Sequence, residues 1–138
     1  MKILVAIDQS GYSQKALECA VAKALSEKAE LFIVSVNEQL YEYAEFAVGV
    51  DIEDKFTTMA HEIVDKAVAY AKGKGVVAHG ELLKSHSAAG AVIDFAKDKG
   101  VDLIVVGSRG RGAIERFLLG SVATKIVTHA TCSVLVVR

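Results

Sequence analysis

The chain contains no proline, although an average usage of about 5% would place about seven prolines in 138 residues. Turns and helix starts must therefore depend on glycine, aspartate and serine. Cysteine is also scarce, because only Cys19 and Cys132 are present and neither belongs to a Cys-x-x-Cys pair. We expect both to be buried structural thiols in a reducing compartment. The histidines are scattered without the spacing of metal ligands, so the sequence predicts no metal site.

Positive and negative charges are nearly balanced. The chain has 16 Lys and Arg residues and 17 Asp and Glu residues, so its formal net charge is −1. Nucleic-acid binding favours a basic face, so this balance argues against an obligatory nucleic-acid partner. No hydrophobic run approaches the ~18–20 residues of a membrane span. The apolar run that follows Lys2 is too short for a signal-peptide core and lacks a cleavage site. We therefore expect a cytoplasmic protein without a membrane contact.

Apolar, β-branched runs alternate with helical patterns along the whole chain. The predicted strands cover residues 2–8, 31–36, 76–83, 102–106 and 133–137. The predicted helices cover residues 10–28, 51–72, 85–99 and 122–129, with Ser10 and either Ser85 or Ser87 as caps. The connections are too long for hairpins, so the pattern predicts one α/β domain, residues 1–138, with a parallel sheet and helices on both faces. The mixed polarity of residues 76–83 is typical of an edge strand.

A glycine-rich segment stands between the fourth strand and the last helix. Gly107 and Gly110 begin it, and Gly120 and Ser121 end it after nine further residues. Glycines let backbone N–H groups approach an anion closely, and a serine at a helix start adds a hydroxyl at the positive end of the helix dipole. Strand ends and ordinary turns would also use these residues one at a time, but the combination predicts a phosphate cradle. It is not a P-loop, because no Gly-Lys-Ser or Gly-Lys-Thr occurs.

Three further residues are candidates because ligands of parallel sheets lie beyond the carboxyl ends of the strands, where strand order reverses. Asp8 ends the first strand, where its carboxylate can accept ribose hydroxyls or cap the helix that follows. Val36 ends the second strand and can offer its main chain to a base edge. Arg109 can pair with phosphate oxygens. An arginine in a polar loop can equally be solvated, as can Arg111 and Arg116.

With these residues in place, the chain resembles the universal stress protein family. The resemblance covers the whole length and is carried by the strand ending in Asp8, by the closing strand 133–137, and above all by a Gly-x2-Gly-x9-Gly-Ser pattern that begins at Gly107. In that family the pattern marks the ATP-binding branch. The resemblance implies an open five-stranded parallel sheet of order 3-2-1-4-5, the adenine nucleotide alpha hydrolase-like fold. It also implies a homodimer that pairs through the last strand.

The resemblance implies a ribose contact at Asp8, base contacts by the main chain at Val36, and phosphate contacts by the glycine segment, Ser121 and Val122. The complete expected nucleotide-binding set is Ile7, Asp8, Val36, Val106, Gly107, Arg109, Gly110, Gly120, Ser121 and Val122. Two positions depart from the family pattern. Ala123 stands where many ATP-binding members have a second hydroxyl, and Ser133 replaces a proline common before the final strand.

The function that these features favour is an ATP-binding regulator of the stress response, with Mg²⁺ accompanying the triphosphate. No Ser-His-Asp or Cys-His arrangement stands out, so we assign no catalytic residue. Two alternatives stay open. The protein could be a slow ATPase or a phosphoryl or nucleotidyl transferase, or it could bind cyclic AMP.

Overall fold

A computed structural model describes residues 1–8, 10–38, 50–109 and 119–138, and of residues 50–56 it describes the backbone. Strands and helices alternate through these ranges. In chain order they are β1 (Lys2–Ala6), α1 (Gly11–Glu27), β2 (Glu30–Asn37), α3 (Val50–Gly73), β3 (Ala78–Lys84), α4 (Ala88–Lys99), β4 (Leu103–Gly107), α5 (Ser121–His129) and β5 (Ser133–Val137).

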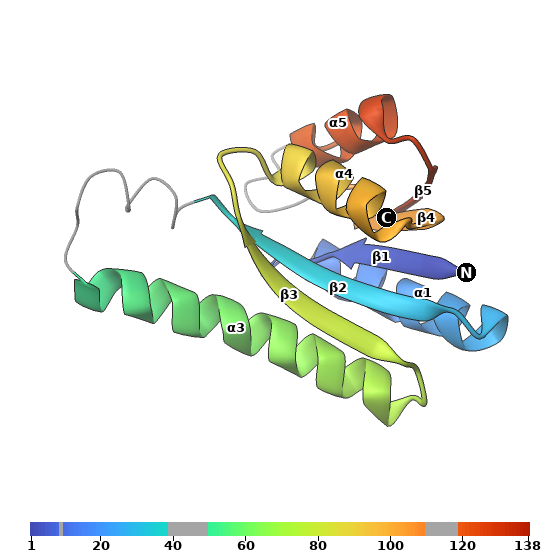
Figure 1. The fold of residues 1–138 in the computed structure, drawn as a ribbon, viewed down its shortest axis with the longest axis horizontal. Coiled ribbons are helices and arrows are strands. Elements are labelled where there is room, and N and C mark those ends of the chain that lie inside the picture. The colour runs from blue at the N-terminus through green and yellow to red at the C-terminus, as the bar shows by residue number, and fades with distance from the viewer. Residues whose placement is uncertain (9, 39–49, 110–118) are drawn as a thin grey trace.

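The strands of the described residues form one sheet in the order β3-β2-β1-β4-β5, and every neighbouring pair is parallel (Figure 1). This confirms the predicted strand order and the edge position of β3. The order reverses beside β1, which pairs with β2 on one side and with β4 on the other. The carboxyl ends of β1 and β4 therefore lie next to each other at the point where this fold class binds ligands.

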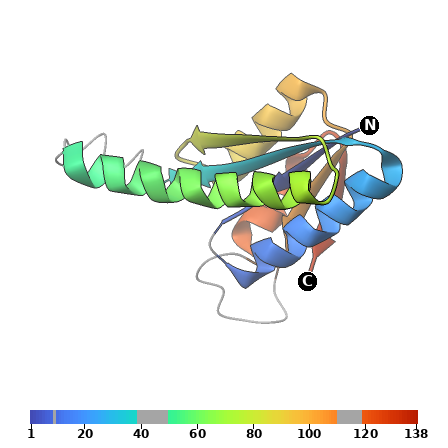
Figure 2. The ribbon, with the colours of Figure 1, turned by 90° about the horizontal axis from the view of Figure 1, so that it is seen from below.

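The helices cover the sheet in two layers, α1 and α3 on one face and α4 and α5 on the other (Figures 1 and 2). Each layer closes its own apolar cluster. The strands between them supply fully buried side chains to both clusters, among them Ile3, Leu4, Leu31 and Ile104. Short apolar strands buried on both faces are the expected sequence signature of a parallel sheet, which the helices cover on both sides.

The strands whose boundaries differ most from those predicted are β1 and β3. β1 ends at Ala6 rather than residue 8, because the Asp8 amide donates to the Ser13 hydroxyl at 2.6 Å instead of to a neighbouring strand. β3 begins at Ala78, because the Val76 amide donates to the Ala71 carbonyl (3.1 Å) and so closes the end of α3. β3 also continues to Lys84.

The serine caps follow the sequence prediction and resolve the alternative left open for α4. Ser10 caps α1 by accepting from the Ser13 amide. Ser87, and not Ser85, caps α4 by accepting from the Gly90 amide at 3.1 Å. Gly100 closes α4 with a left-handed φ of 67°, a conformation that glycine adopts without steric cost.

The expectation of two buried thiols is wrong. Cys19 and Cys132 are free and only half-buried. Cys19 lies on α1, and Cys132 lies just before the edge strand β5, where the sheet has no further neighbour to cover it. The burial that remains raises the pKa of the Cys132 thiol, and the charge of Asp102 adds to that shift, whereas backbone hydrogen bonds partly oppose it.

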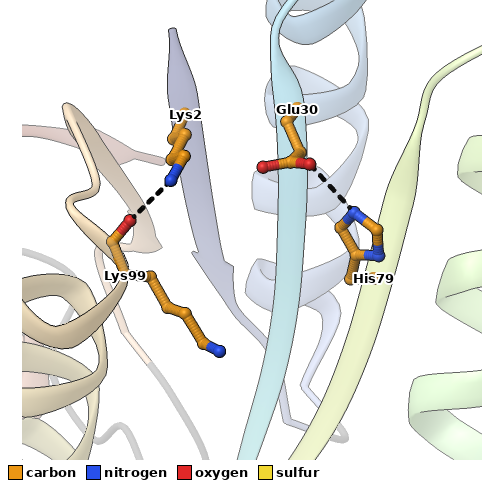
Figure 3. A network of polar contacts seen from close by, with 4 residues as sticks. All are labelled: Lys2, Glu30, His79 and Lys99. Atoms are coloured by element: carbon orange, nitrogen blue, oxygen red, sulfur yellow. Dashed lines mark hydrogen bonds and ion pairs between the residues drawn. The ribbon is translucent and has the colours of Figure 1, made fainter.

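Polar contacts tie the amino ends of the strands together (Figure 3). Lys2 Nζ donates to the Lys99 carbonyl at 3.0 Å, near the end of α4. Glu30 on β2 pairs with His79 on β3, with 3.1 Å between the carboxylate Oε2 and the ring Nε2. These groups are exposed, and pairs of this kind contribute at most about 1 kcal/mol. They lie at the amino ends of the strands, whereas Asp8 and Gly107 lie at the carboxyl ends.

The contact between α3 and β3 depends on a glycine. A Cβ at Gly80 would lie 2.5 Å from Val64 Cγ1 and 2.6 Å from Val68 Cγ2. Valine methyl groups are rigidly placed on their helix, so they cannot move aside by side-chain rotation alone. The absence of a side chain at Gly80 therefore sets how closely α3 approaches the edge strand.

We predict that Gly80→Ala lowers the free energy of unfolding by about 1–3 kcal/mol, the usual cost of overpacking a core. Urea denaturation followed by circular dichroism measures it. Gly73→Ala is the matched control, because a Cβ there meets nothing within 4 Å. Adding Val68→Ala to Gly80→Ala should recover part of the loss. Equal stability of the Gly80→Ala and wild-type proteins would contradict this account of the contact.

Candidate functional site

Asp8 is held by two serines at the start of α1. Its Oδ1 accepts a hydrogen bond from the Ser10 amide at 2.7 Å and another from the Ser13 hydroxyl at 2.9 Å. The Ser13 hydroxyl also accepts from the Asp8 amide. A carboxylate held by several hydrogen bonds keeps one orientation, which is what a binding residue at a strand end requires.

This network answers one question that the sequence left open. The helix cap of α1 is Ser10, and Asp8 fixes the cap from outside the helix. Asp8 is half-buried at the carboxyl end of the central strand β1. Its position fits the predicted ribose contact, and the two roles are compatible because one carboxylate has four acceptor sites.

The glycine-rich segment begins beside Asp8's strand, at the end of β4. The Ser108 amide donates to the Val137 carbonyl, and the Ser108 carbonyl accepts from the Gly120 amide, both at 2.7 Å. The second bond brings the two ends of the segment together, so Gly120 and Ser121 lie next to the end of β4. Ser108 itself is buried, with 7% of its surface exposed.

Gly107 has a packing role that sequence reasoning did not predict. A Cβ at this position would lie 3.1 Å from both the Cβ and the carbonyl oxygen of Tyr12, and 3.2 Å from the Arg109 carbonyl oxygen. The glycine thus allows the first turn of α1 to approach the end of β4. A backbone that close to α1 leaves little free space at Gly107 on the side of Tyr12.

Arg109 is the next residue with a defined partner. Its guanidinium carbon lies over the Tyr12 ring, 5.9 Å from the ring centroid, which is within the range of a cation–π contact. Arg109 is half-buried rather than fully solvated. Tyr12 therefore contacts the beginning of the glycine segment through its backbone at Gly107 and through its ring at Arg109.

The start of α5 completes this side of the site. Gly120 is the residue before the helix and makes no side-chain cap, whereas Ser121 is its first residue and is exposed. The first N–H groups of a helix lack intrahelical partners and favour anions. Thr124 points back along the helix, since its hydroxyl donates to the Leu119 carbonyl at 3.5 Å. Ala123 is 2% exposed in the apolar cluster, so this position serves packing with α4.

The apolar members of the predicted set can contribute through their main chain. Ile7 and Val106 are buried, and Val122 packs against the α4–α5 cluster. The Ile7 amide donates to the Val34 carbonyl at 2.9 Å, which places the end of β1 beside β2, where Val36 pairs with Leu83.

Some predicted residues lie outside the described ranges. Of the binding set this is true of Gly110 alone, and of the flanking arginines it is true of Arg111 and Arg116. The described members of the set lie at the carboxyl ends of β1, β2 and β4 and at the start of α5. Across the described part of the chain, no group of three or more His, Cys, Asp or Glu side chains could hold a metal ion.

A cavity of about 470 Å³ lies between α1 and α3. Asp8 and Ser13 line it at the end of β1, and Leu17, Ile63 and Tyr70 are among the residues of its walls. It lies on a different side of α1 from Tyr12, because Ser13 and Leu17 are turned away from Tyr12 by the helical period. Asp8 therefore has this cavity on one side and the glycine segment of the neighbouring strand on the other.

Comparison with known proteins shows the family of the chain. The sequence profile of the Universal stress protein family matches residues 1–138. The chain belongs to the universal stress protein family. Universal stress protein YxiE of Bacillus subtilis is 36% identical to it over an alignment of 146 positions, gaps included, which covers 99% of this chain and 98% of the relative.

Solved structures share the fold of this universal stress protein. The universal stress protein from Archaeoglobus fulgidus in complex with dAMP superimposes with a TM-score of 0.75 at 24% identity, covering 100% of this chain and 98% of that one. A universal stress protein in complex with cAMP gives a TM-score of 0.74 at 24% identity, with 100% and 96% covered. At this identity the likeness shows the fold. Among residues 1–8, 10–38, 50–109 and 119–138, no helix combines the length and apolar character needed to cross a bilayer.

Sequence reasoning missed three residues of this site in the universal stress protein. Ser13 fixes Asp8, Ser108 closes the glycine segment, and Tyr12 contacts both Gly107 and Arg109. The spacing of Ser13, three residues after the cap Ser10, was a usable signal. Contacts between segments far apart in the chain, such as Tyr12 on α1 with Gly107 at the end of β4, leave no pattern in a single sequence.

Ser13→Ala should lower the free energy of unfolding by about 1–3 kcal/mol, because it leaves the Asp8 amide and Oδ1 without this partner in a half-buried position. Thermal and urea unfolding measure the change. Ser26→Ala is the control, since Ser26 is exposed near the end of the same helix and alanine favours helix. A Ser13→Ala protein as stable as the control would show that the network contributes nothing.

Proposed function

We propose that this universal stress protein binds an adenine nucleotide, and ATP in preference, in the crevice between the carboxyl ends of β1 and β4. The observation that carries the proposal is the hydrogen bond from the Gly120 amide to the Ser108 carbonyl. It brings the N-terminus of α5 to the strand that neighbours Asp8. A hydrogen-bonded carboxylate and the N-terminus of a helix, which favours anions, thus lie next to each other at the carboxyl ends of two neighbouring strands.

In this proposal each end of the nucleotide has its own partners. Asp8 accepts from the ribose hydroxyls, and the main chain at Val36 meets the base edge. The phosphates lie along Gly107, Gly110, Gly120 and Ser121, with Val122 offering its amide in the first turn of α5. Ile7 and Val106 border the crevice through their main chain, since their side chains belong to the core. Arg109 supplies positive charge on the phosphate side.

The structural relatives support the ligand class. The relatives that share the fold include one in complex with dAMP and one in complex with cAMP. Both ligands carry adenine, a sugar and a single phosphate. We favour ATP over a monophosphate or cyclic AMP because the sequence has the full Gly-x2-Gly-x9-Gly-Ser pattern, which marks the ATP-binding branch of the family.

Mg²⁺ would accompany the triphosphate in this proposal. Mg²⁺ usually keeps several waters and binds one or two carboxylates together with substrate phosphates. Phosphate oxygens and water would supply its ligands here, because the Asp8 carboxylate is assigned to the ribose. The protein would act as a nucleotide-dependent regulator rather than as an efficient hydrolase. We place it in the cytoplasm, where a reducing medium suits its two free cysteines.

We also propose that the protein forms a homodimer through β5. This strand is an edge of the sheet, and Val134, Leu135, Val136 and Val137 are all half-buried. An apolar edge strand exposes unpaired backbone groups and invites pairing with another strand. A second copy of the same strand, related by a twofold axis, would cover both the backbone and the side chains.

Calorimetry should show ATP binding with a micromolar Kd, about −8 kcal/mol. ATP, ADP, AMP and cyclic AMP are titrated with and without Mg²⁺. Gly120→Val combined with Ser121→Ala should abolish ATP binding, because it fills the approach to the α5 N-terminus and removes its hydroxyl. Ser26→Ala should bind like the wild type. If no adenine nucleotide binds the wild type, the proposed function is wrong, and unchanged affinity of the double variant would show that the cradle lies elsewhere.

Sedimentation equilibrium should give a dimer for the wild type and a monomer for Val136→Lys, since a lysine on the edge strand opposes strand pairing. Leu25→Lys is the control, because Leu25 is 52% exposed and lies near Gly75, away from β5. Circular dichroism verifies that both variants fold. A wild-type monomer at all concentrations would rule out the dimer.

A further inference from the structure

The unit formed by Tyr12, Gly107 and Arg109 joins the start of α1 to the glycine segment. Because Gly107 has no side chain, the backbone of Tyr12 can lie close to it. A Cβ on Gly107 would stand only 3.1 Å from the Tyr12 carbonyl oxygen. The Tyr12 ring then lies under the Arg109 guanidinium, 5.9 Å from centroid to Cζ. Three residues from two distant parts of the sequence thus determine where one positive charge stands at the site.

A guanidinium held over an aromatic ring keeps its N–H groups available in its own plane. Arginine donates from this plane in a fixed fork that matches two phosphate oxygens at once. An arginine on a free loop would first have to lose its rotational freedom, whereas the ring of Tyr12 limits that freedom before a ligand arrives. Such preorganisation favours binding of an anion at this position.

The position of Arg109 indicates which phosphates it would meet. The ribose is assigned to Asp8 at the end of β1, and Arg109 follows β4, the neighbouring strand, about 4.8 Å away in the sheet. The first phosphate of a nucleotide lies about that far from the ribose hydroxyls, so it reaches the end of β4 at Gly107 and Ser108. Arg109 lies further along the chain, with its guanidinium over the Tyr12 ring, and so suits the phosphates that follow the first. AMP and cyclic AMP have no phosphate beyond that first one.

We propose that Arg109 selects polyphosphate nucleotides over monophosphates and that Tyr12 is the residue that positions it. This inference rests on the proposed function, because it assumes that the nucleotide binds in the β1–β4 crevice. Tyr12 contacts no nucleotide in this account and acts through Arg109. The aromatic ring carries the effect, and the Tyr12 hydroxyl does not.

A double-mutant cycle tests the proposal. Arg109→Gln should weaken ATP binding by about tenfold and leave AMP binding nearly unchanged, as expected for a lost charged hydrogen bond. Tyr12→Leu should weaken ATP binding by about two- to fivefold, the value of an exposed cation–π contact. Tyr12→Phe keeps the ring and should bind ATP like the wild type. In the Arg109→Gln background, Tyr12→Leu should have no further effect.

Titration with inorganic tripolyphosphate separates this proposal from the proposed function. Tripolyphosphate should bind the wild type and lose affinity in Arg109→Gln. Additive effects of the two substitutions, equal losses for AMP and ATP, or a defect in Tyr12→Phe would each overturn the role of Tyr12 or the selectivity. Binding of tripolyphosphate without ATP would overturn the proposed function and support the arginine site. Absence of binding by both ligands would overturn both proposals.

Discussion

The parallel pairing of β1 with β4 is the constraint on which the candidate site depends. Ile3, Leu4 and Val5 pair with Leu103, Ile104 and Val105, and these six residues are almost completely buried. Because the sheet order reverses here, α1 leaves to one face and the chain after β4 returns through α5 on the other. The carboxyl ends of β1 and β4 therefore lie side by side, where ligands bind in this class of sheet. Burial of the central strands thus creates the place where polar residues can gather.

Two sets of hydrogen bonds then shape this part of the molecule. Ser10 and Ser13 fix the Asp8 carboxylate, and the bond between Ser108 and Gly120 holds the N-terminus of α5 against the end of β4. Both sets use short polar side chains or backbone groups, so neither of these turns needs a proline, which the chain lacks. At the amino ends of the strands, exposed polar contacts such as Glu30 with His79 link neighbouring elements without forming a comparable site.

The fold could be predicted from the sequence because each element carries its own local signal. Short apolar runs indicated buried strands, Ser10 and Gly100 marked helix ends, and the mixed polarity of β3 indicated an edge. Boundaries were less accurate where a short-range hydrogen bond beside a helix end stops the strand, as at Asp8 and Val76, because the apolar pattern of the strand does not show that bond. The exposure of Cys132 was not predictable, because it depends on the sheet ending at β5.

The candidate site was predictable in its residue types but not in its contacts. The glycine spacing and the strand ends pointed to Asp8, Gly107 and Ser121, whereas the role of Tyr12 depends on a close approach between segments about 95 residues apart in the chain. Gly107 illustrates the difference. The sequence suggested space for a phosphate, and the structure adds that α1 occupies one side of that space.

The central claim is that an adenine nucleotide occupies the crevice between β1 and β4. Titration of ¹⁵N-labelled protein with ATP, followed residue by residue through amide chemical shifts, tests it most directly. The account predicts saturating shifts at Asp8, at Gly107 to Arg109 and at Gly120 to Val122, with little change at Lys2, Glu30 and Lys99 at the opposite edge. Shifts confined to that opposite edge, or to the α1–α3 cavity around Ile63 and Tyr70, would contradict the claim.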